Sequence, residues 1–188
     1  MTGRALYPTR PGGLEDLEFL WEMLYEAAHH RSLSNPSITR YLEDWGRPGD
    51  AAVVALDPDD GRRVGAAWYR WMSPDSRGYG FIDASTPEVV VAVVPDHRGL
   101  GVGKALLRGL LDKAGSQKFD SLSLSVRRNN PVAIGLYERN GFVKLLDINS
   151  EYSSWTMKVD LTVHERHRTV TNRSAGDGRT ARLTEDAC

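Results

Sequence analysis

Residues 91–104 read VAVVPDHRGLGVGK, and this stretch decides the fold that we expect. The apolar, β-branched residues 89–94 predict a buried strand that stops at Pro95, and the apolar residues 105–111 predict a helix. Between them, three glycines at alternate positions predict a tight turn: Gly99, Gly101 and Gly103. A helix that begins at such a turn presents unpaired N–H groups at the positive end of its dipole, so we expect a polyanionic ligand there.

Two familiar phosphate-binding loops do not fit this spacing. A Walker A loop needs glycine at position 98 and Ser or Thr after Lys104, whereas the chain has Arg98 and Ala105. A dinucleotide fingerprint needs the spacing Gly-x-Gly-x-x-Gly and an acid that ends the next strand, whereas Asp120 precedes that strand. On this stretch alone, a plain glycine-rich turn remains an alternative.

A second stretch, residues 126–142, reads VRRNNPVAIGLYERNGF. Asn130 is a good helix N-cap, and Pro131 is a good first helical residue. The spacing i, i+3, i+4 places three residues on one face of this helix: Ala133, Leu136 and Tyr137. Gly141 predicts the end of the helix, and Phe142 then opens a strand.

Together the two stretches resemble motifs A and B of the GNAT superfamily of N-acetyltransferases, in the order of that family. Motif A, Arg/Gln-x-x-Gly-x-Gly/Ala, matches residues 98–103. Motif B, Asn-x-x-Ala-x-x-Leu-Tyr-x-x-x-Gly-Phe, is matched at every fixed position: Asn130, Ala133, Leu136, Tyr137, Gly141 and Phe142. The resemblance covers about residues 4–161.

The resemblance implies an α/β (α+β) fold with a mixed, mostly antiparallel sheet of six to seven strands and about four flanking helices. The central strands are expected to splay apart where coenzyme A binds. We expect one domain over residues 4–161 and a polar tail over 162–188, which has too few apolar residues to order itself. The patterns predict strands at 4–8, 51–56, 62–72, 88–94, 119–126, 142–147 and 152–161, and helices at 14–30, 37–44, 102–114 and from 131.

The resemblance also implies acetyl-CoA as co-substrate, with its pyrophosphate on the backbone amides of the glycine turn and its pantetheine arm along the central strand. The residues expected to bind it are Val93, Val94, Arg98, Gly99, Leu100, Gly101, Val102, Gly103, Lys104, Asn130 and Tyr137. We expect no metal, because the histidines have no cysteine partner and no ligand-like spacing.

For catalysis, Tyr137 matches the tyrosine that donates to the leaving sulfur in the family, and the Val93 amide is the expected oxyanion donor. Glu88, at the head of the central strand, is the first candidate for the general base. A water chain or an amine that is already deprotonated would also suffice, and Asp83, His29 and His30 are weaker candidates for the base.

The acceptor is the least determined part of the hypothesis. Residues that resemblance places around an acceptor pocket, and that could equally be core, are Trp21, Tyr25, His29, Trp45, Trp68, Trp71, Tyr79, Phe81, Tyr152 and Trp155. We expect a primary amine of a small molecule, with a protein N-terminus or lysine as the alternative. A CoA-binding regulatory module without transfer, or an interaction role for the 164–188 tail, are two other hypotheses.

Composition limits the partners. A net charge of −1 gives no bulk preference for nucleic acid or a membrane, and no apolar run approaches the ~20 residues of a membrane span. Cys188 is the only cysteine, so no internal disulfide can form and a cytoplasmic setting is expected. Many members of the superfamily form dimers, and a homodimer is therefore one expected state.

Overall fold

The computed structural model of the chain describes residues 7–145 and 153–162. Three of the expected strands lie partly outside these described residues: 4–8, 142–147 and 152–161. Tyr152 lies outside them as well. The tail expected to be disordered lies outside them from residue 163 onward.

A seven-stranded sheet in the order β1-β2-β3-β4-β5-β7-β6 forms the centre of the molecule. Every neighbouring pair is antiparallel except β4 and β5, which are parallel, so the expected mixed, mostly antiparallel sheet is confirmed. The strands are β1 (Thr9–Gly12), β2 (Ala51–Leu56), β3 (Arg63–Arg70), β4 (Glu88–Val93), β5 (Ser121–Arg127), β6 (Val143–Leu145) and β7 (Ser154–Asp160).

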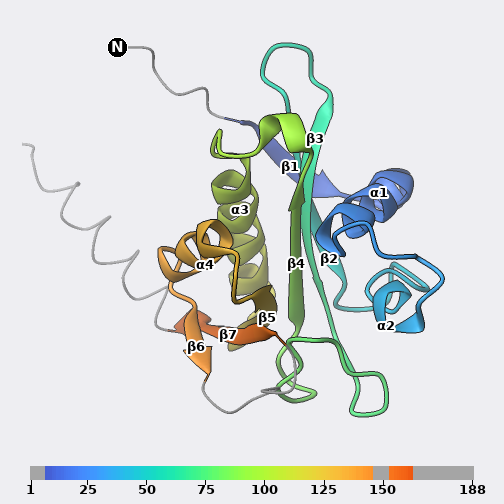
Figure 1. The fold of residues 1–188 in the computed structure, drawn as a ribbon, viewed down its shortest axis with the longest axis vertical. Helices are drawn as coiled ribbons and strands as arrows, with labels where there is room; N and C mark the ends of the chain where they lie inside the picture. Colours follow the sequence, from blue (N-terminus) through green and yellow to red (C-terminus); the bar gives the residue numbers. More distant parts are fainter. Residues whose placement is uncertain (1–6, 146–152, 163–188) are drawn as a thin grey trace, which may run out of the picture.

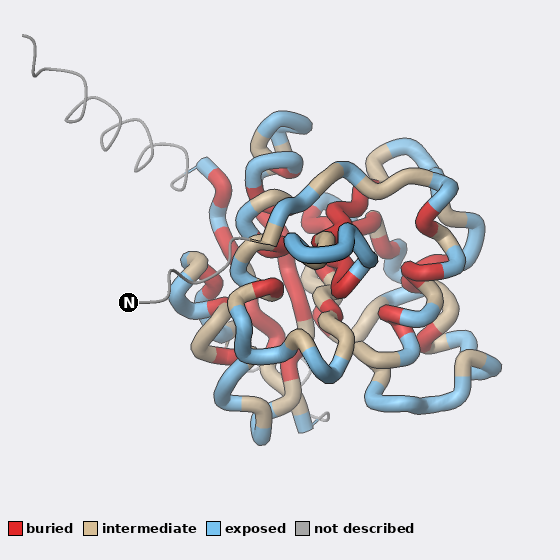
Figure 2. Tube along the Cα trace, turned by 90° about the horizontal axis from the view of Figure 1, so that it is seen from above, coloured by how far each residue is buried: buried red, intermediate tan, exposed pale blue. Residues whose placement is uncertain are grey.

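Helices cover both faces of the sheet (Figure 1). The helices are α1 (Leu17–Ala27), α2 (Pro36–Thr39), α3 (Val102–Ser116) and α4 (Pro131–Glu138), with 3-10 turns η1 (Leu14–Asp16) and η2 (Pro95–His97). α1 and α2 lie on one face, and α3 and α4 lie on the other. The sheet is therefore the middle of three layers, and its buried strands run through the interior of the molecule (Figure 2).

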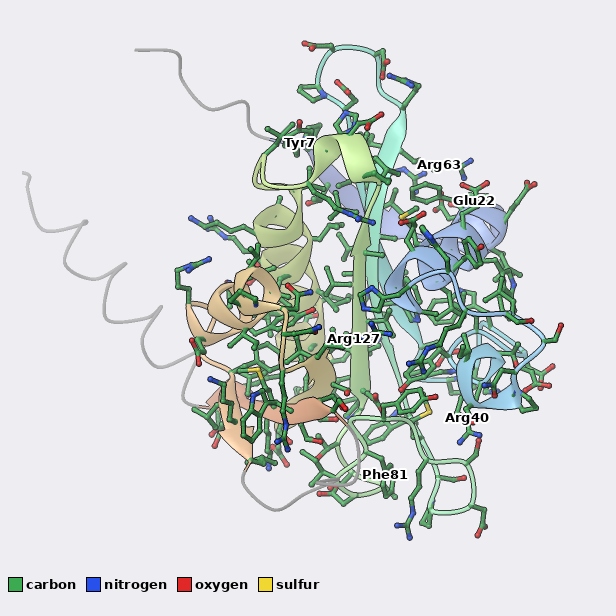
Figure 3. All side chains as sticks on the ribbon, viewed as in Figure 1. Tyr7, Glu22, Arg40, Arg63, Phe81 and Arg127 are labelled. Carbon is green, nitrogen blue, oxygen red and sulfur yellow. The ribbon has the colours of Figure 1, made fainter. Side chains whose placement is uncertain are left out.

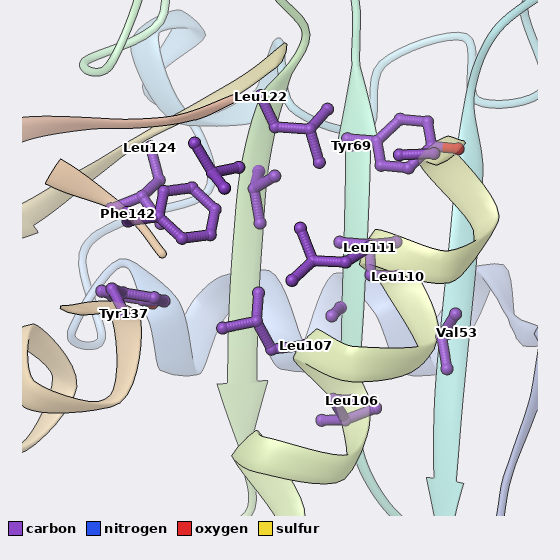
Figure 4. Close-up of a cluster of buried hydrophobic side chains, with 14 of the residues drawn as sticks. Val53, Tyr69, Leu106, Leu107, Leu110, Leu111, Leu122, Leu124, Tyr137 and Phe142 are labelled. Atoms are coloured by element: carbon purple, nitrogen blue, oxygen red, sulfur yellow. The ribbon is translucent and has the colours of Figure 1, made fainter. Parts of the chain in front are cut away.

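Alternation along the strands divides the core into two clusters. On β4, Val89 packs with the cluster beneath α3 and α4, whereas Ala92 packs with the cluster beneath α1. On β5, Leu122 and Leu124 belong to the α3 cluster (Figure 4), so Ser123 and the other odd-numbered residues face the α1 side. Glu88 is therefore on the α1 face of the sheet, next to the serine face of β5.

β4 and β5 pair only at one end. Their single register pair is Glu88 with Ser123, and the Ser123 N–H donates to the Pro87 carbonyl at 2.9 Å. Beyond this point β5 leaves β4 and runs with β7, with which it pairs over its whole length. In Figure 1 the β5–β7–β6 part of the sheet turns away from β4. The expected splaying of the central strands is thus present, and the unpaired part of β4 borders a gap.

Several expected boundaries moved, and the larger shifts have a physical reason. The first described strand is Thr9–Gly12, and Tyr7 and Pro8 of the strand expected at 4–8 precede it. It is an edge strand, where Pro11 costs no ladder hydrogen bond. The helix expected at 14–30 ends at Ala27, because His29 and His30 have left-handed backbone with φ of 54° and 61°.

The helix expected at 37–44 is also shorter, and covers only Pro36–Thr39. The buried guanidinium of Arg70 donates to the carbonyls of Arg40 and Glu43 at 2.8 Å each. These carbonyls therefore accept hydrogen bonds from a side chain of β3 rather than only from the backbone of a longer helix. The segment after Thr39 continues as turns. No helix within the described ranges has both the length and the apolar character needed to cross a membrane.

Candidate active site

The glycine turn after β4 has the backbone that only glycine adopts cheaply. Gly99 and Gly101 have φ of 76° and 101°. Gly103 is favoured for another reason: a Cβ there would lie 3.2 Å from the Leu136 side chain of α4, which would have to shift slightly. Two of the three glycines therefore shape the turn, and the third leaves room for a side chain of α4.

The N-terminus of α3 points its first N–H groups out of the helix. The Ala105 N–H donates to the Gly101 carbonyl at 3.1 Å, and this is the first hydrogen bond within the helix. The N–H groups of Val102, Gly103 and Lys104 precede it and so have no acceptor within the helix. The Val102 side chain is buried in the core, which leaves only its backbone for a ligand. The Lys104 side chain is exposed beside the turn.

Arg98 is held by the protein itself. Its Nε donates to the Val93 carbonyl at 3.0 Å, and its other guanidinium nitrogen lies 2.6 Å from a carboxylate oxygen of Glu26 on α1. The expectation of a phosphate-binding Arg98 is therefore refined: the side chain connects the end of β4 to the last turns of α1.

The backbone of β4 faces the gap at alternate residues. The Val94 N–H donates to the Val64 carbonyl at 3.0 Å, so Val94 is bound to β3. In an antiparallel ladder the residues between such pairs turn their N–H and C=O groups the other way, which places those of Val91 and Val93 at the gap. Of the two residues expected along the pantetheine arm, Val93 thus has its backbone groups at the gap, whereas the Val94 N–H is used in the sheet.

A cleft of about 2400 Å³ joins the glycine turn, the gap and the α1 face of the sheet. It contains most of the residues expected at the site: Glu88, Val93, Arg98, Gly99, Leu100, Gly101, Gly103, Lys104, Asn130 and Tyr137. The side chains of Val94 and Val102 are not among its walls. Asn130 also caps α4, because its side-chain oxygen accepts the Ala133 N–H at 3.1 Å.

Glu88 is buried at the floor of this cleft, only 2% exposed. Its Oε1 accepts the Tyr41 hydroxyl at 2.6 Å and the Gly80 N–H at 2.7 Å. Burial raises the pKa of Glu88 to about 7, because these hydrogen bonds and the nearby Arg40 charge only partly offset the cost of desolvating the carboxylate. A carboxyl group with such a pKa can change protonation state near neutral pH.

Two buried oxygens near this point have no hydrogen-bond partner in the part of the chain that the structure describes: Oε2 of Glu88 and Oγ of Ser123. Their residues are register neighbours on β4 and β5, and both are on the α1 face. Neighbouring strands lie ~4.8 Å apart. Buried polar atoms normally have partners, so this pair marks a place for a water molecule or a polar ligand group.

Tyr137 comes to the cleft from α4, on the opposite side of the gap. It is 8% exposed, and its ring packs against Phe142 with 5.8 Å between the centroids. No described residue forms a hydrogen bond with its hydroxyl group that would restrain it. Burial raises the pKa of Tyr137 to about 12, so the phenol keeps its proton throughout the neutral range.

The aromatic residues expected around the acceptor mostly have structural roles. Trp68 is fully buried and its Nε1 donates to the Tyr41 carbonyl at 3.2 Å, and Trp71 packs on Phe119. Trp45 and Trp155 lie beneath the guanidinium groups of Arg70 and Arg128. The members of the expected set that line the cleft are His29 and Tyr79. Trp21, Tyr25 and Phe81 are not among its walls.

The alternative bases differ in position. Asp83 lies in an exposed loop, accepts from Ser85, and does not line the cleft. His29 and His30 line it, and Glu26 holds His30 through a contact of 3.0 Å. The described residues contain no group of three or more His, Cys, Asp or Glu side chains that could hold a metal ion.

Sequence reasoning missed Tyr41 and Arg127. Tyr41 forms a hydrogen bond with Glu88, which is 47 residues away in the sequence, and no local pattern predicts such a contact. Arg127 lines the cleft from the end of β5. The alternation of serine and apolar residues before it already placed it on the serine face, so this signal was available in the sequence.

Comparison with known proteins agrees with this arrangement. Residues 16–142, more than half of the chain, match the model of the Acetyltransferase (GNAT) family. A mycothiol acetyltransferase from Arthrobacter sp. is 31% identical over 133 residues, which are 68% of this chain and 39% of that protein. The chain thus spans well under half of that relative's length.

Solved structures show the same fold. A ribosomal-protein-alanine N-acetyltransferase from Brucella melitensis superposes with a TM-score of 0.60 at 23% identity, over 81% of this chain and 99% of that one. The PaiA N-acetyltransferase from Thermoplasma acidophilum, in complex with coenzyme A, gives a TM-score of 0.56 at 20% identity over 83% and 99% of the two chains. On the matched family model and the fold, the chain belongs to the acetyltransferase (GNAT) family.

Proposed function

We propose that the protein transfers the acetyl group of acetyl-CoA directly to a primary amine of a small molecule. The observation that carries this proposal is the single cleft that runs from the N-terminus of α3, through the gap beside β4, to the buried carboxyl group of Glu88. Such a cleft can hold a phosphate-bearing donor at one end and an amine at the other, with the thioester between them.

The donor half of the site rests on backbone groups. The N–H groups at the start of α3 favour the pyrophosphate, since they lack helical acceptors and lie at the positive end of a fifteen-residue helix. The N–H and C=O groups of Val91 would pair with the pantetheine arm as a strand does, since the Val93 carbonyl already accepts from Arg98 Nε. The Val93 N–H then serves as hydrogen-bond donor to the oxyanion that forms from the thioester carbonyl.

Glu88 is the proposed general base. The amine nitrogen attacks the carbonyl carbon, and the ammonium proton passes to Glu88, directly or through a water at its free Oε2. A pKa of about 7 suits this task, because about half of the carboxyl groups are then ionised at neutral pH and the carboxylate is still basic enough to accept a proton.

Tyr137 is proposed to stabilise the leaving thiolate as the carbon–sulfur bond breaks. Its pKa of about 12 lies well above the ~8.5 of a thiol, so complete proton transfer to sulfur would cost on the order of 5 kcal/mol. A hydrogen bond from the phenol to the developing thiolate has no such cost. We therefore assign Tyr137 the role of hydrogen-bond donor, with the thiol proton coming finally from the amine or from solvent.

An acceptor screen tests the proposal. The purified protein is mixed with acetyl-CoA and a panel of small amines, amino acids and short peptides, and free thiol is measured over time. Release that depends on a small primary amine, together with the acetylated amine in the mass spectrum, supports the proposal. Release only with peptides would shift the assignment to protein acetylation, and tight acetyl-CoA binding without release would indicate a CoA-binding module.

A further inference from the structure

The acceptor side of the cleft carries an excess of positive charge. Five basic side chains line it from the α1–α2 connection and from the end of β5: His29, His30, Arg31, Arg127 and Arg128. Two acidic side chains border this side, and both are already used: Glu26 binds Arg98 and His30, and Glu88 is buried at the floor. The acidic side chains of this part of the lining therefore do not neutralise its basic ones, and a net positive charge remains.

Arg127 is the central member of this group. It is half-buried at the end of β5, and none of the described residues forms an ion pair or hydrogen bond with its guanidinium group. The same holds for the exposed side chain of Arg31. Arg128 differs, because it lies over Trp155 at 4.2 Å and reaches the Ser154 carbonyl. A half-buried guanidinium group without a counter-ion has lost part of its hydration and gained no partner for its charge, so it favours the binding of an anion.

Arg127 and the expected binding site of the donor phosphates lie on opposite faces of the sheet. Leu122, Leu124 and Val126 of β5 pack beneath α3 and α4, so Arg127, one residue further, is on the opposite α1 face with Ser123. The phosphate turn lies at the start of α3, where Lys104 and Arg108 line the cleft. Figure 3 labels Arg127, which in that view lies over the middle of β4, between α4 and the α1–α2 side.

The cluster is close enough to act on one ligand group. His29, Arg31, Arg98 and Arg127 line the same cleft. The pKa of His29 is lowered, first by burial and then by the positive charges of Arg127, Arg31 and Arg98, so these charges act on the same imidazole. Along β5, Arg127 is four residues from Ser123, the register neighbour of Glu88, which is ~13 Å of strand. The arginine side chain spans part of this distance, so one small molecule can reach both ends.

We infer that the acceptor carries an anionic group, such as a carboxylate, which Arg127 and Arg31 bind while its amine lies against Glu88. This inference rests on the proposed function and narrows its substrate class to amines that are also acids. A guanidinium group is the side chain best suited to a carboxylate, because its planar donors match the two oxygens.

Matched acceptors test the inference. Each primary amine found active in the thiol-release screen is compared with a partner that differs only in one charge: 4-aminobutyrate with 4-aminobutyramide, and alanyl-aspartate amide with alanyl-asparagine amide. We expect the anionic member to have at least a tenfold higher kcat/KM. In Arg127→Gln, and more so in the double variant with Arg31→Gln, this preference should fall at least fivefold through a higher KM of the anionic acceptor.

Two controls keep the outcome decisive. The KM of acetyl-CoA should stay unchanged in Arg127→Gln, and Arg62→Gln, an exposed arginine outside the cleft, should leave the preference intact. Equal turnover of anionic and neutral amines by the unaltered protein, or a rise in the KM of acetyl-CoA alone in Arg127→Gln, would overturn this inference and leave the proposed function standing. No thiol release with any primary amine would overturn the proposed function itself.

Discussion

The hydroxyl group of Tyr41 donates a hydrogen bond to Oε1 of Glu88 at 2.6 Å, in a part of the cleft where both residues are buried. The same hydroxyl accepts the Tyr79 N–H at 2.7 Å, and the Gly80 N–H donates to the same Oε1. A residue just after α2 and a loop before β4 thus fix one oxygen of the carboxyl group. The other oxygen, Oε2, has no hydrogen-bond partner among the described residues.

Replacing Tyr41 by Phe should make the carboxylate harder to ionise. The hydrogen bond that is lost favours the ionised form, and hydrogen bonds to charged groups contribute about 1.5–3 kcal/mol. The pKa of Glu88 should therefore rise by about one to two units. Because the base must be deprotonated, kcat/KM rises with pH through this pKa, and the rising limb should move to higher pH. Tyr69 is a buried tyrosine on the α3 face of the sheet, and its hydroxyl donates to Gln117. The control variant Tyr69→Phe should leave the rising limb unmoved. An unmoved limb in Tyr41→Phe would contradict the link between these two residues.

Replacing Glu88 by Gln should remove the base with little change in shape. General-base catalysis contributes about 10²–10⁴ in rate, so kcat/KM for the amine should fall by at least tenfold, and the limb near pH 7 should disappear. The KM of acetyl-CoA should stay the same, and Asp83→Asn, in the exposed loop, should behave like the unaltered protein. If Glu88→Gln keeps the rising limb of the kcat/KM profile near pH 7, water or a histidine acts as the base instead.

Replacing Tyr137 by Phe should slow the departure of the thiolate. The phenol packs tightly but its hydroxyl has no partner among the described residues, so the variant should fold normally and lose at least tenfold in kcat. Acetyl-CoA affinity, measured by calorimetry, should change by less than about twofold. Tyr69→Phe serves again as the matched buried control. Unchanged kcat in Tyr137→Phe would exclude a role for its hydroxyl group in the reaction.

Two glycines allow a matched test of the phosphate turn. Gly99 and Gly61 have φ of 76° and 73°, and a Cβ would have open space at both positions, so alanine costs about 1–2 kcal/mol of backbone strain in each. Only Gly99 belongs to the cleft. Gly99→Ala should therefore weaken acetyl-CoA binding at least fivefold, whereas Gly61→Ala should destabilise the hairpin turn without affecting binding. Equal acetyl-CoA affinity in the two variants would argue against the turn as the phosphate site.

The Arg70–Asp50 ion pair should be the costliest single charge contact to break. The two groups lie 2.9 Å apart, with side chains 1% and 3% exposed. In Asp50→Ala the guanidinium group stays buried without its counter-charge, and the free energy of unfolding should fall by about 3–5 kcal/mol in a denaturant titration. Asp60→Ala breaks the exposed pair with Arg62 and should cost at most about 1 kcal/mol. Equal losses would mean that Asp50 is not the effective counter-ion of Arg70.

Local sequence was sufficient for the elements that build the donor half. The strand that ends before Pro95, the glycine turn and the helix from Val102 appear in the structure almost as predicted, because each is specified by residues next to one another. The cap at Asn130 and the helix after it follow the same logic. The expected arrangement of the sheet was confirmed through the resemblance to a family, since strand order depends on contacts that no local pattern encodes.

The short helix after Asn35 shows where local reasoning failed. Helical spacing continued to position 44, but the buried guanidinium of Arg70 binds the carbonyls of Arg40 and Glu43. A contact between residues thirty positions apart outweighed a weak local preference. The same tertiary contact helps to hold the segment that carries Tyr41.

The sequence by itself determined that this chain has a glycine-rich turn before a helix, a tyrosine on one face of the next helix, and a glutamate at the head of the central strand. Only the tertiary structure decided what these groups can do. It buried Glu88 and gave it Tyr41 and Gly80 as partners. It used the Val94 amide in the sheet and left that of Val93 at the gap, and it brought Arg127 to the wall of the same cleft. The reason is physical: a turn or a cap depends on adjacent residues, whereas burial, pKa and charge around a site depend on which distant segments the fold brings together.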